Sequence, residues 1–202
     1  MKYPNFNEEK KLWLKGYKVV AGLDEAGRGT LAGPVVAAAV FVKPNSNFLL
    51  KGINDSKKLS EKQREHLYNI LIKNKDIKWG IGIVSETVID RINILEATKL
   101  AMKKAIKNIK PDFLVLDGNF SLKLDLPQKS IIKGDGKVMS CAMASVIAKV
   151  TRDRLMKKLH KKYPHYGFDK HKGYGTKVHF ANIEKFGSCK IHRKSFYPIN
   201  KA

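Results

Sequence analysis

The sequence is poor in cysteine and in long apolar runs, and each scarcity excludes a class of protein. Cys141 and Cys189 are the only cysteines among 202 residues and show no metal-ligand spacing, so we expect reduced thiols and no disulfide framework. The longest apolar run, Val35 to Val42, is far shorter than the roughly 20 residues that span a bilayer. The first 18 residues lack the apolar core of a signal peptide. These features predict a soluble, cytoplasmic protein without a membrane partner.

Acidic residues are also scarce, because 18 Asp and Glu stand against 40 Lys and Arg, for a formal net charge of +22. Such a charge favours a polyanionic partner, nucleic acid first and an anionic membrane surface second. Only six of the basic residues are arginine, so a lysine-rich genome composition could account for part of the excess. The charge therefore indicates nucleic acid without saying what is done to it. A 43% hydrophobic chain of this length fits one folded domain.

Two adjacent carboxylates, Asp24 and Glu25, end an apolar run and precede the turn Gly27-Arg28-Gly29. Carboxylates at the end of a buried strand can hold a hard divalent cation. Glycines let the main chain approach a ligand closely, and an arginine between them suits phosphate recognition. Strand alternation sends Asp24 and Glu25 to opposite faces, so the strand must end or twist there if both reach one ion. A solvated acidic pair followed by a tight turn is the alternative interpretation.

A second acid, Asp117, ends the apolar run of residues 113–116. A continuous apolar run of this length is typical of a central strand in parallel pairing. If this strand lies parallel to the one that carries Asp24, both aspartates emerge at one edge of the sheet, where open α/β folds bind ligands. Asp117-Gly118 also fits an Asx turn. The sequence alone leaves both interpretations open.

The remaining pattern predicts strands at residues 18–24, 34–43 and 78–85, and helices that open at Ser60, near residue 86, near residue 138 and at Thr176. On the helix of residues 138–160, Ser145, Lys149 and Asp153 share one stripe at i, i+4 and i+8. Asp153 alone would be interpreted as a surface acid. It becomes a candidate site residue because the three other candidate acids would need a fourth acid to complete a site.

Tyr174 lies between two glycines in the segment of residues 171–176. Aromatic rings interleaved with lysine and histidine are what stacking on sugars and bases beside phosphates requires. A large ring flanked by glycines favours binding over core packing. For Tyr163 and Phe168 we prefer the core.

Further motifs follow the opening segment Asp24-Glu25-Ala26-Gly27-Arg28-Gly29 in a fixed order. They are Asn54-Asp55-Ser56-Lys57-Lys58-Leu59, Leu116-Asp117-Gly118, Ala144-Ser145-Val146-Ile147-Ala148-Lys149-Val150-Thr151-Arg152-Asp153, His171-Lys172-Gly173-Tyr174-Gly175-Thr176 and His192-Arg193-Lys194-Ser195-Phe196. Together these motifs resemble bacterial ribonuclease HII, the type 2 ribonuclease H family, from about residue 17 onward. The resemblance implies an α/β, ribonuclease H-like fold with a mixed central β-sheet flanked by helices. It implies a single domain, residues 1–202, whose residues from about 155 to 202 form a helical, substrate-binding extension.

The resemblance also implies a site and an activity. The family's four catalytic, metal-binding acids fall on Asp24, Glu25, Asp117 and Asp153. Substrate-binding positions fall on Gly27, Arg28, Gly29, Lys57, Ser145, Lys149 and the sugar-stacking Tyr174. Two Mn²⁺ or Mg²⁺ ions about 4 Å apart would relieve the repulsion among the acids. The implied enzyme is an endonuclease that cuts RNA paired to DNA and single ribonucleotides in duplex DNA, leaving 5′-phosphate and 3′-hydroxyl ends, in DNA replication and repair.

The sequence departs from the family at two positions and lacks one tail. Thr30 stands where many members carry proline, and Val138 where many carry a serine, which puts a phosphate contact and substrate affinity in question. No glutamine-and-aromatic tail of the kind that binds a sliding clamp is seen, so we expect no such docking. Separately, we expect a monomer.

Two other functions compete with this interpretation. One is a metal-dependent nuclease or recombinase of the same fold class that acts on ordinary DNA. The turn at residues 27–29 together with Tyr174 disfavours it, because reading a 2′-hydroxyl has no purpose on DNA. The other is a basic binding module without chemistry. Four acids in a cationic chain disfavour it, because uncompensated acids would repel phosphate.

Overall fold

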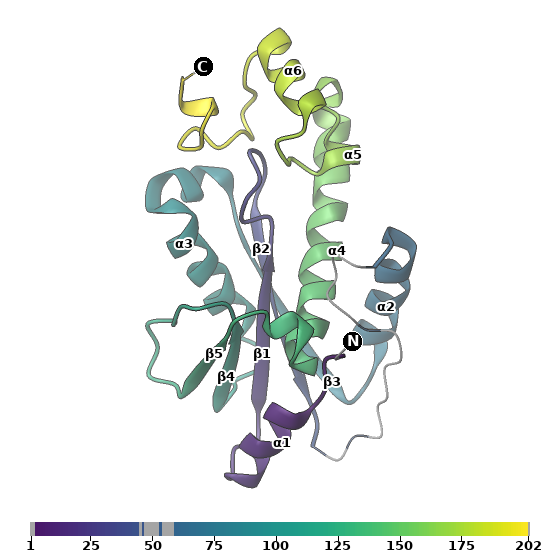
Figure 1. Cartoon of the computed structure of the whole chain (residues 1–202), viewed down its shortest axis with the longest axis vertical. Coiled ribbons are helices and arrows are strands. Elements are labelled where there is room, and N and C mark those ends of the chain that lie inside the picture. The colour runs from purple at the N-terminus through teal and green to yellow at the C-terminus, as the bar shows by residue number, and fades with distance from the viewer. Residues whose placement is uncertain (1–2, 45, 47–52, 54–58, 202) are drawn as a thin grey trace.

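A five-stranded sheet forms the centre of the molecule, in the order β3-β2-β1-β4-β5 (Figure 1). The computed structural model describes residues 3–44, 46, 53 and 59–201. The strands are β1 (Val20–Ala26), β2 (Val35–Val42), β3 (Ile77–Val84), β4 (Phe113–Asp117) and β5 (Gln128–Ile131). The β1–β2 and β2–β3 pairs are antiparallel, and the β1–β4 and β4–β5 pairs are parallel. The sheet is therefore mixed, as the sequence predicts.

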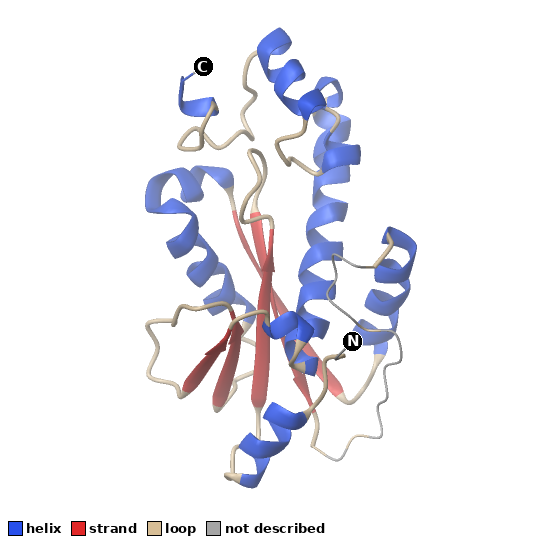
Figure 2. Ribbon diagram, viewed as in Figure 1, coloured by secondary structure: helices blue, strands red, loops and turns tan. Residues whose placement is uncertain are grey.

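Helices cover both faces of the sheet (Figure 2). They are α1 (Asn7–Leu14), α2 (Glu61–Lys73), α3 (Glu86–Ala105), α4 (Met139–Lys162), α5 (Phe168–His171) and α6 (Lys177–Phe186), with short 3₁₀ turns η2 (Gly134–Gly136), η3 (Pro164–Tyr166) and η4 (Ile199–Lys201). The predicted starts hold: Ser60 and Gln63 form a capping box, and Thr176 accepts a hydrogen bond from the His179 N–H. Helix α1 and strand β5 were not predicted.

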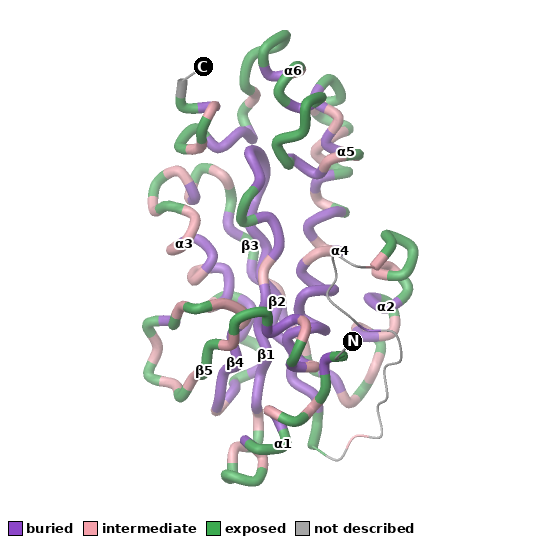
Figure 3. Tube along the Cα trace, in the orientation of Figure 1, coloured by how far each residue is buried: buried purple, intermediate pink, exposed green. Residues whose placement is uncertain are grey.

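Alternation along β1 divides its side chains between the two helical layers. Ala21 and Leu23 belong to the core under α3, while α2 and α4 pack on the opposite face. Any Cβ on Gly22 would overlap Ser140 at the start of α4, so this glycine lets the helix lie directly on the strand. Strands β1, β2 and β4 and the inner side of α4 are among the most deeply buried parts of the chain, whereas β5 has no buried residue (Figure 3). Asp24 lies on the same face of β1 as Gly22, beneath α4.

Helix α4 extends beyond the sheet, and the C-terminal segments pack around its far end (Figure 1). Their core contains Met156, Phe168, Ile183 and Ile191, together with Leu31 from the turn after β1. Phe168 is fully buried, as predicted, and Tyr163 is half-buried at the edge of this cluster.

Both cysteines are free thiols, Cys141 buried and Cys189 half-buried. Within the described ranges, no helix combines the length and the apolar character needed to cross a bilayer.

Candidate active site

Two aspartates meet at the carboxyl edge of the parallel strands β1 and β4. Leu23 pairs with Leu116 in parallel register, so Asp24 and Asp117 take the next position on neighbouring strands. This confirms the predicted parallel arrangement. One oxygen each of Asp24, Asp117 and Asp135 lie within 4.8 Å of one another, in the one such group of three found among the described residues.

Asp135 is a residue that sequence reasoning missed. It lies in η2, and the neighbouring Gly134 N–H donates a 2.7 Å hydrogen bond to Asp117 Oδ1, which ties this turn to the end of β4. The turn reaches the edge because β5, the strand before it, runs parallel to β4. The signal that could have revealed Asp135 is therefore the parallel strand preceding it, which returns the chain to the same edge.

The three carboxylates are held together against their mutual repulsion. Burial, followed by the charges of Glu25, Asp117 and Asp135, raises the pKa of Asp24 well above its ordinary value. The Glu25 N–H opposes this shift through a 2.7 Å hydrogen bond to Asp24 Oδ1. Oxygen ligands crowded in this way fit a hard divalent cation such as Mg²⁺ or Mn²⁺, which would lower the repulsion among them.

Glu25 lies on the other face of β1. The strand continues past Asp24 to Ala26, with Asp24 opposite Ala38 and Glu25 opposite Ala37. The predicted end of this strand at residue 24 is wrong, because its pairing with β2 runs two residues further. Glu25 Oε1 lies 3.6 Å from an Arg28 guanidinium nitrogen. Glu25 is outside the group of three, and its role as a metal ligand stays a prediction.

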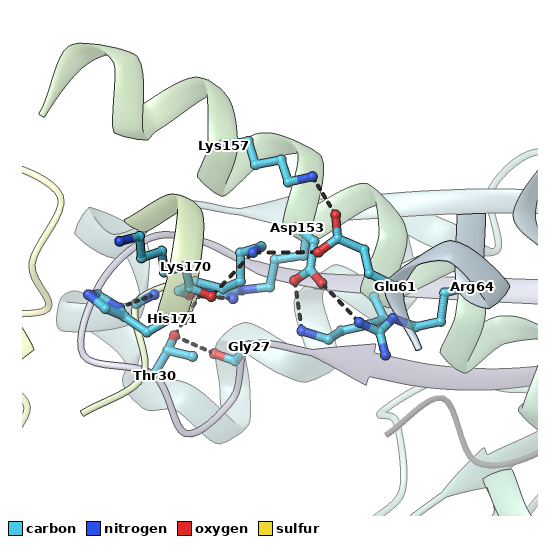
Figure 4. Close-up of polar contacts among 12 residues, drawn as sticks. Gly27, Thr30, Glu61, Arg64, Asp153, Lys157, Lys170 and His171 are labelled. Carbon is cyan, nitrogen blue, oxygen red and sulfur yellow. Dashed lines mark hydrogen bonds and ion pairs between the residues drawn. The ribbon is translucent and has the colours of Figure 1, made fainter. Parts of the chain in front are cut away.

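Asp153 lies on α4, next to Arg64 of α2 (Figure 4). Its carboxylate is 2.7 Å from Lys149 Nζ and 3.9 Å from an Arg64 guanidinium nitrogen. The predicted stripe on α4 thus brings Lys149 and Asp153 together. Ser145, the third member, is buried and donates its hydroxyl to the Ala142 carbonyl of its own helix. Asp153 is not part of the group formed by Asp24, Asp117 and Asp135.

A buried arginine shapes the turn after β1 from the inside. Gly27 has φ +89°, and a Cβ there would overlap the Arg152 side chain. Arg152 is 1% exposed and donates to the Thr30 hydroxyl at 2.8 Å and to three carbonyls, those of Ala32, Pro34 and Lys172. Burial lowers the pKa of Arg152 to about 10, which leaves it protonated at neutral pH.

A second buried arginine, Arg193, holds the same turn from the C-terminal segment. It is fully buried and donates to the carbonyls of Gly27 at 2.6 Å, Arg28 at 2.9 Å and Gly33 at 3.1 Å. Burial lowers its pKa to about 9. Arg28 and Gly29 remain exposed on the outer side of the turn. The turn is therefore rigidly supported from within while its outer face is open.

The two departures from the family have structural roles. The Thr30 hydroxyl accepts from Arg152 and donates to the Gly27 carbonyl at 3.1 Å, so it joins the network that holds the turn (Figure 4). Val138 is fully buried and packs with Leu12 and Cys141. The side chain at position 138 thus faces the core, and the effect of this departure on substrate affinity stays a prediction.

Tyr174 and Lys149 lie next to each other near this turn. Tyr174 is 42% exposed, and Lys149 Nζ lies 5.8 Å from the centroid of its ring. The Leu31 N–H donates a 2.8 Å hydrogen bond to the Gly173 carbonyl, which links the segment after the turn to the loop that carries Tyr174. Lys57, the remaining predicted substrate-binding residue, lies outside the described residues.

A mixed sheet with carboxylates at the shared edge of its parallel strands places this chain among the α/β proteins of ribonuclease H-like fold. The crystal structure of ribonuclease H2 from Pyrococcus horikoshii superposes with a TM-score of 0.73 at 30% identity, covering 91% of this chain and 96% of that one. The family model described as Ribonuclease HII matches residues 21–199.

Two curated relatives carry the same name. Ribonuclease HII of Acetivibrio thermocellus is 58% identical over 193 residues, 93% of this chain and 73% of the relative. That of Chlamydia caviae is 53% identical over 195 residues, 96% of this chain and 91% of the relative. The chain belongs to the ribonuclease HII family, and it is accordingly a hydrolase, an endoribonuclease of the ribonuclease H type.

Proposed function

We propose that this protein cuts the RNA strand of RNA–DNA hybrids and incises duplex DNA at single embedded ribonucleotides, leaving 5′-phosphate and 3′-hydroxyl ends. The observation that carries this proposal is the group of Asp24, Asp117 and Asp135 at one edge of the sheet, close along the chain to an exposed glycine–arginine–glycine turn. Carboxylates supply the chemistry for phosphodiester hydrolysis, and the turn supplies a means to read the sugar.

Asp24, Asp117 and Asp135 would hold Mn²⁺ or Mg²⁺, with Glu25 as a further ligand from the same strand. When bound, two such ions stabilise both the attacking and the leaving oxygen of an in-line displacement. In this proposal Asp135 is the fourth metal-binding acid, in place of Asp153, which the sequence analysis suggested. The hydrogen bond from Gly134 to Asp117 and the buried position of Asp24 keep these carboxylates preorganised.

The turn at residues 27–29 would read the ribose. Gly27 is required by the packing of Arg152, but a Cβ on Gly29 would have no neighbour within 4 Å. Nothing within the described chain therefore demands glycine at position 29, which supports the close approach of a ligand. The carbonyls of Gly27 and Arg28 are engaged by Arg193, so the turn can direct N–H groups at the 2′-hydroxyl and the adjacent phosphate. Arg28 would contact that phosphate.

Tyr174 would stack on the next sugar, with Lys149 beside it. A ring packed against that sugar leaves no room for a 2′-hydroxyl, so a deoxyribose is preferred there and cleavage falls at an RNA-to-DNA junction. We assign this contact to the C-terminal extension, residues 155–202, within a single domain. Substrate contacts by Lys57 and Ser145 stay predictions.

The direct test is a cleavage assay on matched duplexes that contain zero, one or four ribonucleotides, with Mg²⁺, with Mn²⁺ and with a chelator. We expect cleavage of the second and third duplexes only, only with metal, and with 5′-phosphate products. Cleavage of the all-DNA duplex would instead support a nuclease acting on ordinary DNA. Binding without cleavage under every metal condition would support a module without chemistry.

A pair of substitutions separates the two candidates for the fourth acid. We expect Asp135→Asn to slow single-turnover cleavage about a thousandfold, because a metal ligand contributes several kcal/mol to transition-state stabilisation. Asp153→Asn should stay within about tenfold of wild type, because Asp153 is paired with Lys149 and Arg64 and lies outside the group of three carboxylates. The reverse order of losses would restore Asp153 to the metal site and remove Asp135.

A further inference from the structure

Three histidines gather behind the loop that carries Tyr174. His179 and His192 are 0% and 1% exposed, and His171 is half-buried. The rings of His171 and His179 stack with centroids 4.4 Å apart, and His179 Nε2 lies 3.0 Å from His192 Nε2. None of the three belongs to the group of carboxylates. Their role must come from what their ring nitrogens contact.

Main-chain partners determine which nitrogen of His179 and His192 carries the proton. The Cys189 N–H donates to His192 Nδ1 at 2.9 Å, so a neutral His192 is protonated on Nε2. The Tyr174 carbonyl lies 2.9 Å from His179 Nδ1 and can only accept, so His179 is protonated on Nδ1. His192 Nε2–H therefore donates to the lone pair of His179 Nε2. A one-way chain of hydrogen bonds results, from the Cys189 main chain to the Tyr174 carbonyl.

Burial keeps this pair neutral, because it lowers the pKa of His179 and of His192 to about 4. His171 completes the arrangement from the other side. Its Nε2 donates to the Tyr166 carbonyl at 2.7 Å, and its Nδ1 accepts from the Gly173 N–H at 3.2 Å. Each ring nitrogen of the three histidines is thus satisfied in a single tautomer.

The chain of hydrogen bonds ends on the peptide group of Tyr174. The Tyr174 carbonyl also accepts the Thr176 N–H at 2.9 Å, and Thr176 in turn caps α6 through the His179 N–H. Leu31 holds the preceding carbonyl, that of Gly173, from the side of the glycine turn. The main chain of Tyr174 is therefore held between the turn and the histidines, while its ring is exposed.

We propose that His179, supported by His192, is a positioning residue that sets the place of the Tyr174 ring against the sugar and thereby the preference for a ribonucleotide-to-deoxyribonucleotide junction. Neither histidine touches the substrate or transfers a proton. This inference rests on the proposed function, in which Tyr174 stacks on the sugar.

Two amide substitutions at position 179 distinguish positioning from general support of the fold. In His179→Asn the amide nitrogen takes the place of Nδ1 and can still donate to the Tyr174 carbonyl. In His179→Gln the amide takes the place of Nε2 and faces His192, so the bond to Tyr174 is lost. Both variants remove the imidazole, which makes each the control for the other. Melting temperature reports how much fold stability each one loses.

The activity readout is kcat and KM on two duplexes, one with a single ribonucleotide and one with four. We expect His179→Gln to raise KM on the single-ribonucleotide duplex about tenfold, the effect of losing one hydrogen bond of about 1.4 kcal/mol, with a smaller change on the other duplex. His179→Asn should retain most cleavage of both, even if it melts lower. In a Tyr174→Ala background, His179→Gln should cause no further loss on the single-ribonucleotide duplex.

The inference would be overturned if His179→Asn and His179→Gln lost cleavage equally on both duplexes. It would also be overturned if His179→Gln lost as much cleavage in the Tyr174→Ala background as in the wild type. Either result would leave the proposed function intact. If Tyr174→Ala loses cleavage equally on both duplexes, Tyr174 does not select an RNA-to-DNA junction, and this inference fails as well. Should His179→Gln not fold, His192→Asn serves instead, because it keeps the acceptor for Cys189 but removes the donor to His179. Unchanged discrimination in that variant would equally overturn the inference.

Discussion

Asp24 is buried beside other carboxylates, and this position raises its pKa. Its folded pKa is raised, so between the unfolded and folded pKa values the folded state binds more protons than the unfolded state. Stability from this group therefore falls as pH rises through that range. Above its unfolded pKa this carboxyl group destabilises the metal-free protein, because the folded state favours its neutral form, and a bound cation would reverse the effect. We expect the same repulsion among carboxylates to favour the binding of a divalent cation.

Asp24→Asn should accordingly raise the melting temperature in chelator by several degrees, since about 1 kcal/mol corresponds to roughly 2–4 °C in a domain of this size. It should also abolish cleavage and most of the stabilisation by Mn²⁺. Scanning calorimetry with and without metal measures both effects. Asp153→Asn is the matched control: it leaves Lys149 and Arg64 without their shared carboxylate, so it should lower the melting temperature. A destabilised Asp24→Asn protein in chelator would contradict the argument.

At the scale of elements, α1 supports the start of α4. Val138 at the N-cap offers no side-chain cap. Instead the Glu9 carboxylate accepts from the Ser140 N–H at 2.9 Å and from the Ser140 hydroxyl at 2.7 Å. Asn5 forms a parallel bridge with Val138, which brings the N-terminal segment alongside the chain that follows the Asp135 turn. Helix α1 and the segment before it, which precede the residues matched by the family model, thus support both the turn that carries Asp135 and the start of α4.

We expect Glu9→Ala to destabilise the protein by about 1–3 kcal/mol, because two buried donors of Ser140 lose their acceptor. Glu9→Gln should cost less, since its carbonyl oxygen can still accept and burial already raises the pKa of Glu9. Glu8→Ala is the neighbouring control: Glu8 forms only ion pairs with the exposed Lys11 and Lys129, so the change should be within about 1 kcal/mol. Urea unfolding measures all three. Equal losses for Glu8→Ala and Glu9→Ala would refute the bracing role.

The elements that could be predicted from sequence are those with a local signal. A continuous apolar run marked β4, and side-chain caps at Ser60 and Thr176 marked two helix starts. Strand β5, by contrast, has the short, polar sequence Gln-Lys-Ser-Ile, and its pairing with β4 makes it a strand. Without β5 the Asp135 turn could not be placed at the acidic edge. Helical spacing correctly paired Lys149 with Asp153, but spacing along one helix does not reveal which acids another element brings near.

At the scale of the whole molecule, a chain with a net charge of +22 holds a group of three aspartates at one edge of its sheet. The carboxylates of Asp24, Asp117 and Asp135 would repel phosphate on their own. We expect a bound divalent cation and the excess of lysines together to let a phosphate approach this edge. Binding and chemistry should therefore depend differently on charge: affinity on the many lysines, and cleavage on the few acids.

This division predicts a steep salt dependence of binding that is separate from cleavage. Measured by fluorescence anisotropy in chelator, log affinity for a duplex with one ribonucleotide should fall linearly with log salt, with a slope of about −0.9 per phosphate neutralised. Arg28→Gln should reduce the magnitude of the slope by about 1, because it removes one phosphate contact. Tyr174→Ala should weaken binding at every salt concentration without changing the slope, because a stacked ring neutralises no phosphate.

A flat response between low and physiological salt would show that the lysines reflect composition and do not form a binding surface. A slope that changed with Tyr174→Ala and not with Arg28→Gln would reverse the roles assigned to these two residues.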